Sequence, residues 1–141
     1  EKFSRRVAQA IVKAREKSLI KTTVELANIV RSVVPRSGNI DPATRTFQAI
    51  RIWVNDELNE LLNGLQSAGK FLRPGGVMVA VSFHSLEDKI IKVVFKNFCD
   101  RRILPERSFS LLYKKVITPT SEEIKLNPRS RSAKLRALRC L

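Results

Sequence analysis

The beginning of the chain shows two short stretches with helical periodicity. In "SRRVAQAIVKAREKS", Val7, Ile11 and Ala14 recur at the spacing of one face of an α-helix. In "TTVELANIVRSVVP", Thr22 is followed three residues later by Glu25, which is the pattern of a capping box, and a proline closes the stretch. Together they predict a small helical unit that must pack its apolar faces on other parts of the protein.

A longer helical pattern begins at "DPATRTFQAIRIWVNDELNELLNGL". Asp41 is expected to be the N-cap and Pro42 the first helical residue. One helix of about six turns is predicted by apolar residues that step by three or four: Phe47, Ile50, Val54, Leu58, Leu61 and Leu65. Arg45, Thr46 and Gln48 lie near its start, where free backbone N–H groups favour an anion such as phosphate. We predict that these three bind substrate; capping and solvent contact are the alternative.

A strand, a turn and a second long helix follow. The run "VMVAVS" comes after Gly75 and Gly76 and is continuously apolar, as expected for a central parallel strand buried on both faces. "SLEDKIIKVVFKNF" resumes helical spacing, with Ser85 as the expected N-cap. Ser82 and His84 therefore stand at the carboxyl end of a strand, where open α/β folds bind their ligands.

His84 is the single histidine of the chain. An imidazole with its ordinary pKa of about 6.5 can accept or donate a proton at neutral pH, so we predict a catalytic role for His84. The alternative is structural: the ring nitrogens could tie the strand to the start of the helix.

The last part of the chain predicts two further strands around a short helix. "FSLLYKKVIT" is rich in β-branched and aromatic residues, Thr120 and Glu123 form another capping signal, and "AKLRALRCL" alternates apolar with basic residues. We expect the final strand to pair antiparallel with the one before it. The predicted fold class is α/β, with about half of a sheet present.

Charge is the strongest compositional signal. The chain has 27 Lys and Arg against 13 Asp and Glu, a net charge of +14. Residues 1–36 and 71–141 carry this excess, which favours a polyanionic partner such as nucleic acid. No stretch has the length and apolarity of a membrane span, and Cys99 and Cys140 are too isolated to predict a zinc site or a disulfide.

Three blocks together resemble one family: "DPATRTFQAIRIWVNDEL", "LRPGGVMVAVSFHSLEDKIIK" and "NPRSRSAKLRALR". They are similar to the MraW/RsmH family of S-adenosylmethionine-dependent methyltransferases, which modify the exocyclic N4 of a cytidine in small-subunit rRNA. The resemblance implies the C-terminal half of a class I (Rossmann-like) methyltransferase sheet, preceded by part of an inserted helical domain. Residues 1–41 would belong to this RNA-recognition insertion and residues 42–141 to the methyltransferase domain.

The resemblance also implies roles for particular residues. Ser82, His84 and Ser85 would approach the acceptor cytosine, and Arg129 and Arg131 would bind the RNA. The family's glycine-rich loop, which holds S-adenosylmethionine, has no counterpart here, so the main donor site is expected in an N-terminal half. The expected partners are that half and small-subunit rRNA or an assembling small ribosomal subunit, with neither membrane nor DNA.

Two further expectations remain open. A non-catalytic basic RNA-binding module acting in ribosome assembly needs only the charged surfaces, and it is the alternative to the enzyme. The family usually has His where this chain has Asp41. That departure, together with a pI near 10.6, favours the mitochondrial matrix over the bacterial cytoplasm as the location.

Overall fold

The computed structural model describes residues 2–36, 38, 40–106 and 108–141. The chain divides into two compact units, Glu1–Glu57 and Leu58–Leu141. This division falls later than the expected boundary between residues 41 and 42. The assignment of residues 1–41 to an RNA-recognition insertion stays a prediction.

The described residues of the first unit form three helices: α1 (Ser4–Lys17), α2 (Thr23–Val33) and α3 (Ala43–Val54). Its core is a small apolar cluster built from all three helices and the residue after α2: Val7, Ala27, Val30, Val34 and Ala43. The prediction of two short helices with a capping box is confirmed, because the Glu25 N–H donates to the Thr22 hydroxyl at 3.2 Å and the Glu25 carboxylate accepts from the Thr22 N–H at 3.2 Å.

The prediction of one continuous helix after Asp41 is wrong. α3 ends at Val54 and a separate helix, α4, spans Glu57–Phe71. Asp56 between them has a φ of 50°, a left-handed conformation that an α-helix cannot contain. Val54, just before the break, is exposed, whereas Leu65 in α4 is buried.

The second unit contains a three-stranded sheet. Its strands are β1 (Val77–Ser82), β2 (Phe109–Leu111) and β3 (Lys134–Cys140), in the order β1-β3-β2. β3 pairs antiparallel with both neighbours. The α/β class and the antiparallel pairing of the last strand are confirmed, although the strand predicted at "FSLLYKKVIT" is reduced to β2 and an isolated bridge between Ile117 and Leu135.

The expectation of a central parallel strand at residues 77–82 is wrong within this chain. Among the described residues β1 pairs only with β3, and it pairs antiparallel. Side chains alternate across a strand, so Met78 and Ser82 are buried on one face while Val77, Val79 and Val81 are exposed on the other. β1 is therefore an edge strand with one uncovered face in the part of the chain that the structure describes.

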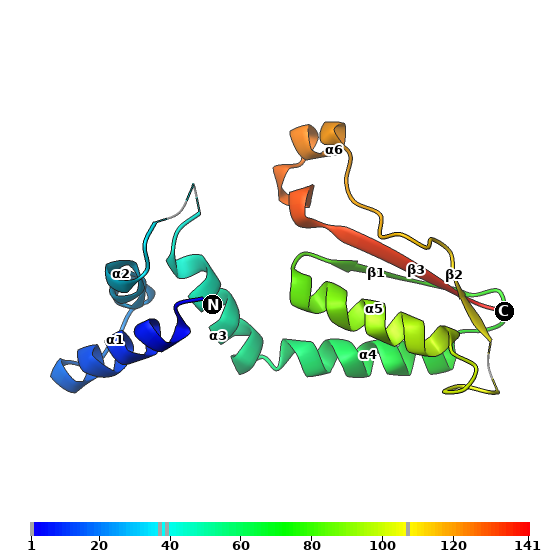
Figure 1. Ribbon diagram of the computed structural model, residues 1–141, viewed down its shortest axis with the longest axis horizontal. Helices are drawn as coiled ribbons and strands as arrows, with labels where there is room; N and C mark the ends of the chain where they lie inside the picture. The colour runs from blue at the N-terminus through cyan, green and yellow to red at the C-terminus, as the bar shows by residue number, and fades with distance from the viewer. Residues whose placement is uncertain (1, 37, 39, 107) are drawn as a thin grey trace. The chain divides into compact units, whose positions relative to one another are not determined.

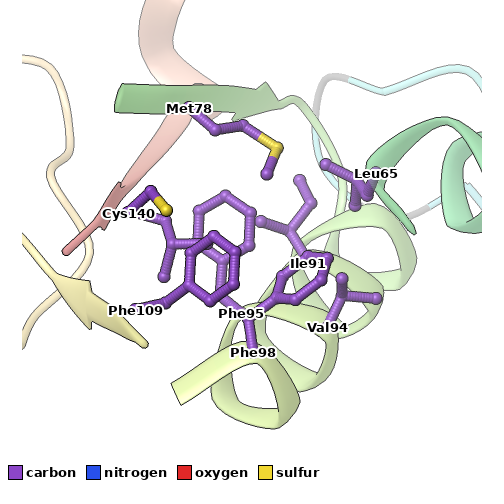
Figure 2. Close-up of a cluster of buried hydrophobic side chains, with 9 residues drawn as sticks. Leu65, Met78, Ile91, Val94, Phe95, Phe98, Phe109 and Cys140 are labelled. Carbon is purple, nitrogen blue, oxygen red and sulfur yellow. The ribbon is translucent and has the colours of Figure 1, made fainter. Parts of the chain in front are cut away.

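Helix α5 (Ser85–Cys99) lies along one face of the sheet (Figure 1). Figure 2 shows Met78 and Cys140 of the sheet pointing toward side chains of α5, among them Ile91 and Phe95. α4 packs against α5 at Gly69, where an added Cβ would lie 2.2 Å from the Phe98 ring. Burial of these apolar side chains holds the second unit together.

Two short helices lie between β2 and β3. α6 (Ser121–Leu126) is capped by Thr120, whose hydroxyl accepts from the Glu123 N–H at 3.1 Å, as predicted. A 3-10 helix, η1 (Pro128–Ser132), then leads directly into β3. None of the described helices has the length and apolarity of a membrane span.

Candidate functional site

Several predicted site residues meet at one end of the sheet in the second unit. β1 ends at Ser82, which pairs with Lys134 at the start of β3. α5 begins just after β1, and η1 ends just before β3 (Figure 1). The structure therefore places these predicted residues at the same end of the sheet: Ser82, His84, Ser85, Arg129 and Arg131.

The turn between β1 and α5 is held by a capping box. His84 is the N-cap, so the expectation that Ser85 caps this helix is wrong. The Nδ1 atom of His84 accepts from the Glu87 N–H at 3.4 Å. In return, Glu87 Oε2 accepts from the N–H groups of Phe83 at 2.9 Å and His84 at 3.4 Å. These bonds fix the backbone of the turn.

This geometry decides what the His84 ring can do. In a neutral imidazole, an accepting Nδ1 leaves the proton on Nε2. Nε2 lies 3.2 Å from Glu87 Oε1, but it is buried and has no aligned hydrogen-bond partner among the described residues. The lone pair of His84 therefore faces the helix start, and the ring must leave its cap before it can accept a proton from a substrate.

The two serines differ in their access to a ligand. Ser82 is only 1% exposed, and its hydroxyl donates to the Lys134 carbonyl at 3.5 Å. Ser85 is exposed. Of the two, only the Ser85 hydroxyl can reach a ligand from solvent without a rearrangement of the sheet.

An ion cluster that the sequence did not predict ties α5 to β3. Asp88 accepts from Arg136 Nε at 2.9 Å and lies 3.3 Å from Lys134 Nζ. The hydrogen bond from Arg136 is the main cause that lowers the pKa of Asp88. Arg136 is consequently engaged in the fold. No signal in the sequence indicated this role, because Arg136 is one of the basic residues that alternate with apolar ones along the predicted strand.

The 3-10 helix η1 presents two arginines to solvent. Asn127 Oδ1 accepts from the Arg129 N–H at 3.2 Å, and the hydroxyl of buried Ser130 donates to the Asn127 carbonyl at 2.8 Å. Arg129 and Arg131 are exposed and have no ion-pair partner among the described residues. Their charges are available to a polyanion.

The remaining predicted substrate residues belong to the first unit. Arg45 is exposed, Gln48 is half-buried and Thr46 is buried, with no hydrogen-bond partner for its hydroxyl among the described residues. Arg45 also lines a shallow hollow together with Phe3, Val34, Pro35, Ile40, Asp41 and Pro42. On this helix, Arg45 and Gln48 can share a ligand, whereas Thr46 is closed off from it.

Asp41 has a defined structural role. Its carboxylate accepts from Arg31 Nε at 3.1 Å and from the Ala43 N–H at 2.9 Å, and both bonds lower the pKa of Asp41. The prediction of Asp41 as N-cap and Pro42 as first helical residue is off by one position, because Pro42 is the N-cap of α3, but the Asp41 carboxylate still binds the N–H of its first residue. Asp41 also joins α2 to α3.

Metal and thiol chemistry find little support in the described residues. They contain no group of three or more His, Cys, Asp or Glu side chains placed to hold a metal ion. Cys99 and Cys140 are both free thiols, and Cys140 is buried. Burial raises the pKa of the Cys99 thiol, which makes it a poorer nucleophile at neutral pH.

Comparison with known proteins gives a consistent result. Residues 1–141 match the model of the MraW methylase family. The chain is 60% identical to a ribosomal RNA small subunit methyltransferase H of Wolbachia sp. subsp. Brugia malayi, with 100% of this chain and 43% of the relative covered. It is likewise 60% identical to the protein of that name from Ehrlichia chaffeensis, with 98% and 48% covered.

The chain thus spans about half the length of the curated relatives it matches. Those relatives come from bacteria. The expectation of a mitochondrial matrix location is therefore wrong, and the bacterial cytoplasm, its alternative, fits the relatives.

Proposed function

Because this chain belongs to the MraW methylase family, we propose that it forms the C-terminal part of an rRNA methyltransferase. The complete enzyme transfers a methyl group from S-adenosylmethionine to the exocyclic N4 of a cytidine in small-subunit rRNA. The observation that carries the proposal is the match over residues 1–141, supported by relatives named ribosomal RNA small subunit methyltransferase H. The partners are small-subunit rRNA, free or in an assembling subunit, and the N-terminal half of the enzyme.

The chemistry requires careful placement of the acceptor base. The lone pair of an exocyclic amine is delocalised into the ring, so the base must be extruded, oriented and shielded from water. The turn at the end of β1 supplies a rigid support for this purpose, because Glu87 fixes the N–H groups of Phe83 and His84. The exposed Ser85 hydroxyl and the arginines of η1 provide polar and cationic groups for the RNA.

The described residues do not fit the main site of S-adenosylmethionine. Gly75 and Gly76 form the turn that leads into β1, at the opposite end of this strand from Ser82. A donor cradle in α/β enzymes instead follows a strand at its carboxyl end. We therefore assign the principal donor site to the N-terminal half.

In this proposal His84 positions the turn between β1 and α5. A second version, in which His84 also accepts a proton from the amine, must be distinguished from the first by experiment. His84→Ala removes the N-cap, whereas His84→Asn keeps a side chain that caps helices well. If His84 positions the turn, His84→Asn in the intact enzyme recovers most of the turnover that His84→Ala loses. If it accepts the proton, both variants lose about 100-fold or more.

The measurement is single-turnover methyl transfer with labelled S-adenosylmethionine and small-subunit rRNA, alongside thermal melts of the same samples. A variant with a lowered melting temperature but full turnover per folded molecule would reduce His84 to a purely structural residue. The wild-type pH–rate profile gives an independent readout, because only the proton-acceptor version predicts a loss of rate when the ring is protonated.

One observation favours a second candidate function, a non-catalytic RNA-binding module. The basic residues of α1 are exposed on its outer side: Arg5, Arg6, Lys13, Arg15 and Lys17. Such a surface binds phosphates without any catalytic group. RNA binding without methyl transfer by the intact protein, in the presence of the donor, would support the module and exclude the enzyme.

A further inference from the structure

An exposed phenylalanine stands at the end of β1, next to the predicted site residues. All seven phenylalanines lie in the described ranges, and two of them, Phe71 and Phe83, are exposed. Phe83 is 56% exposed, while the preceding Ser82 is 1% exposed. Covering such a ring is favourable, and Phe83 stands at the expected ligand end of the sheet.

We propose that the Phe83 ring is the stacking surface for the extruded acceptor base. This proposal rests on the proposed methyltransferase function and deepens it by naming a residue that positions the substrate base. Aromatic side chains commonly stack on unpaired bases, since every base has a flat π-face. Given the proposed function, the occupant is the unpaired cytosine that accepts the methyl group.

The backbone of Phe83 is unusually well fixed for an exposed position. Its N–H donates to Glu87 Oε2 at 2.9 Å, and the next residue, His84, is the N-cap of α5. The first turns of α5 are in turn bound to β3 through Asp88 and Arg136. A ring presented from such a turn loses little conformational freedom on binding, which strengthens an interaction.

The same hydrogen bonds argue against phosphate as the ligand of this turn. Glu87 Oε2 already accepts from the N–H groups of Phe83 and His84, and His84 Nδ1 accepts from the Glu87 N–H. The three backbone N–H groups in these bonds are donors that a helix start otherwise offers to an anion. The turn therefore offers an aromatic face, while cations for the adjoining phosphates come from Arg129 and Arg131.

Charge near the turn also suits an RNA. The residue before Phe83 pairs with Lys134, and η1 with its two exposed arginines leads into β3 at this point. The exposed row on β1 is different in character, because Val77, Val79 and Val81 are aliphatic. Aliphatic side chains suit packing against protein, whereas the aromatic Phe83 stands just beyond the strand, at the end of the sheet where η1 leads into β3.

The test uses the intact enzyme with Phe83→Leu, Phe83→Tyr and the control Phe71→Leu. Phe71 lies at the end of α4 and is 85% exposed. Phe71→Leu is therefore the same substitution at an exposed phenylalanine outside the proposed site. Methyl transfer to small-subunit rRNA is measured as kcat and KM for the RNA. We expect Phe83→Leu to lower kcat/KM by about tenfold or more, with donor affinity unchanged, while Phe83→Tyr and Phe71→Leu stay within about twofold of the wild type.

A second readout does not depend on catalysis. An unstructured RNA carrying a fluorescent cytidine analogue is titrated with wild type and Phe83→Leu. Stacking predicts quenching by the wild type that is reduced in the variant.

Three results would overturn the proposal: equal quenching by both proteins, a kcat/KM of Phe83→Leu equal to that of Phe71→Leu, or a loss explained by instability with normal turnover per folded molecule. The last result would mean that another part of the enzyme covers Phe83. If the wild type transfers no methyl group, the proposed function fails, and the fluorescence titration still decides whether Phe83 stacks on a base.

Discussion

Two glycines in α4 provide a matched test of how closely this helix approaches α5. A Cβ added at Gly69 would lie 2.2 Å from Cζ, 2.7 Å from Cε1 and 2.9 Å from Cε2 of Phe98. A Cβ added at Gly64 meets no atom within 4 Å. We predict that Gly69→Ala destabilises the protein and that Gly64→Ala stabilises it.

The magnitudes follow from two opposing effects. Alanine is favoured over glycine inside a helix by about 0.5–1 kcal/mol, and this gain applies at both positions. At Gly69 the Phe98 ring must also move, yet it is buried and its centroid lies 5.0 Å from that of Phe109. Overpacking a core costs about 1–3 kcal/mol. The difference between the two variants isolates this cost, because the helix preference is common to both.

The assay is urea denaturation of the intact protein, monitored by circular dichroism. The change in the free energy of unfolding is taken from the shift of the urea midpoint, provided that the dependence of this free energy on urea concentration is the same in both variants. A Gly69→Ala variant as stable as Gly64→Ala would refute the close approach of α4 and α5. Combining Gly69→Ala with Phe98→Leu gives a further check. If the ring is the obstacle, the double variant loses less than the sum of the two single losses.

Three other predictions concern charge and the donor. Asp88→Asn should lower stability at neutral pH by about 1.5–3 kcal/mol. The pKa of Asp88 is lowered by folding, so its contribution is present above the ordinary carboxylate pKa and is lost as pH falls through the lowered value; a difference from wild type that persists in strong acid would contradict this. Replacing Arg129 and Arg131 by Ala should reduce the salt dependence of RNA binding by a slope of about 0.7–0.9 for each phosphate that the protein no longer binds, whereas Arg136→Ala should chiefly lower stability. Finally, calorimetry on the 141-residue chain should detect no tight binding of S-adenosylmethionine, and micromolar affinity would contradict the placement of the donor site elsewhere.

The sequence was informative where a few neighbouring residues determine the structure. Three features were predictable because each depends on residues that are close together in the sequence: the capping box of Thr22 and Glu25, the cap at Thr120 and the strand at residues 77–82. The turn after β1 was predicted one residue late. Ser85 looked like the usual N-cap, and only the geometry shows His84 in that role, with Glu87 as its partner.

Features that depend on distant residues could not be predicted. The apolar repeat through Val54 and Leu58 indicated one helix, and nothing local marked Asp56 as left-handed. Asp88 and Arg136 lie 48 positions apart, so their pairing follows only from the register of β1 and β3. The burial of β1 was overestimated for a related reason: an apolar run does not say whether the same chain covers both of its faces.

The strand order has a consequence for how this protein is made. β3 lies between β1 and β2 in space but is translated after both. On the ribosome, the nascent chain therefore carries "VMVAVS", an uncharged β-prone segment, before its partner in this sheet exists. Such segments are prone to aggregate as long as they are unpaired. α5 depends on local interactions and can form early, but the sheet can close only after Lys134–Cys140 has emerged. A ribosome that terminates before this segment would release a chain in which neither β1 nor β2 has its pairing partner, so quality control should be most demanding until Lys134–Cys140 has emerged.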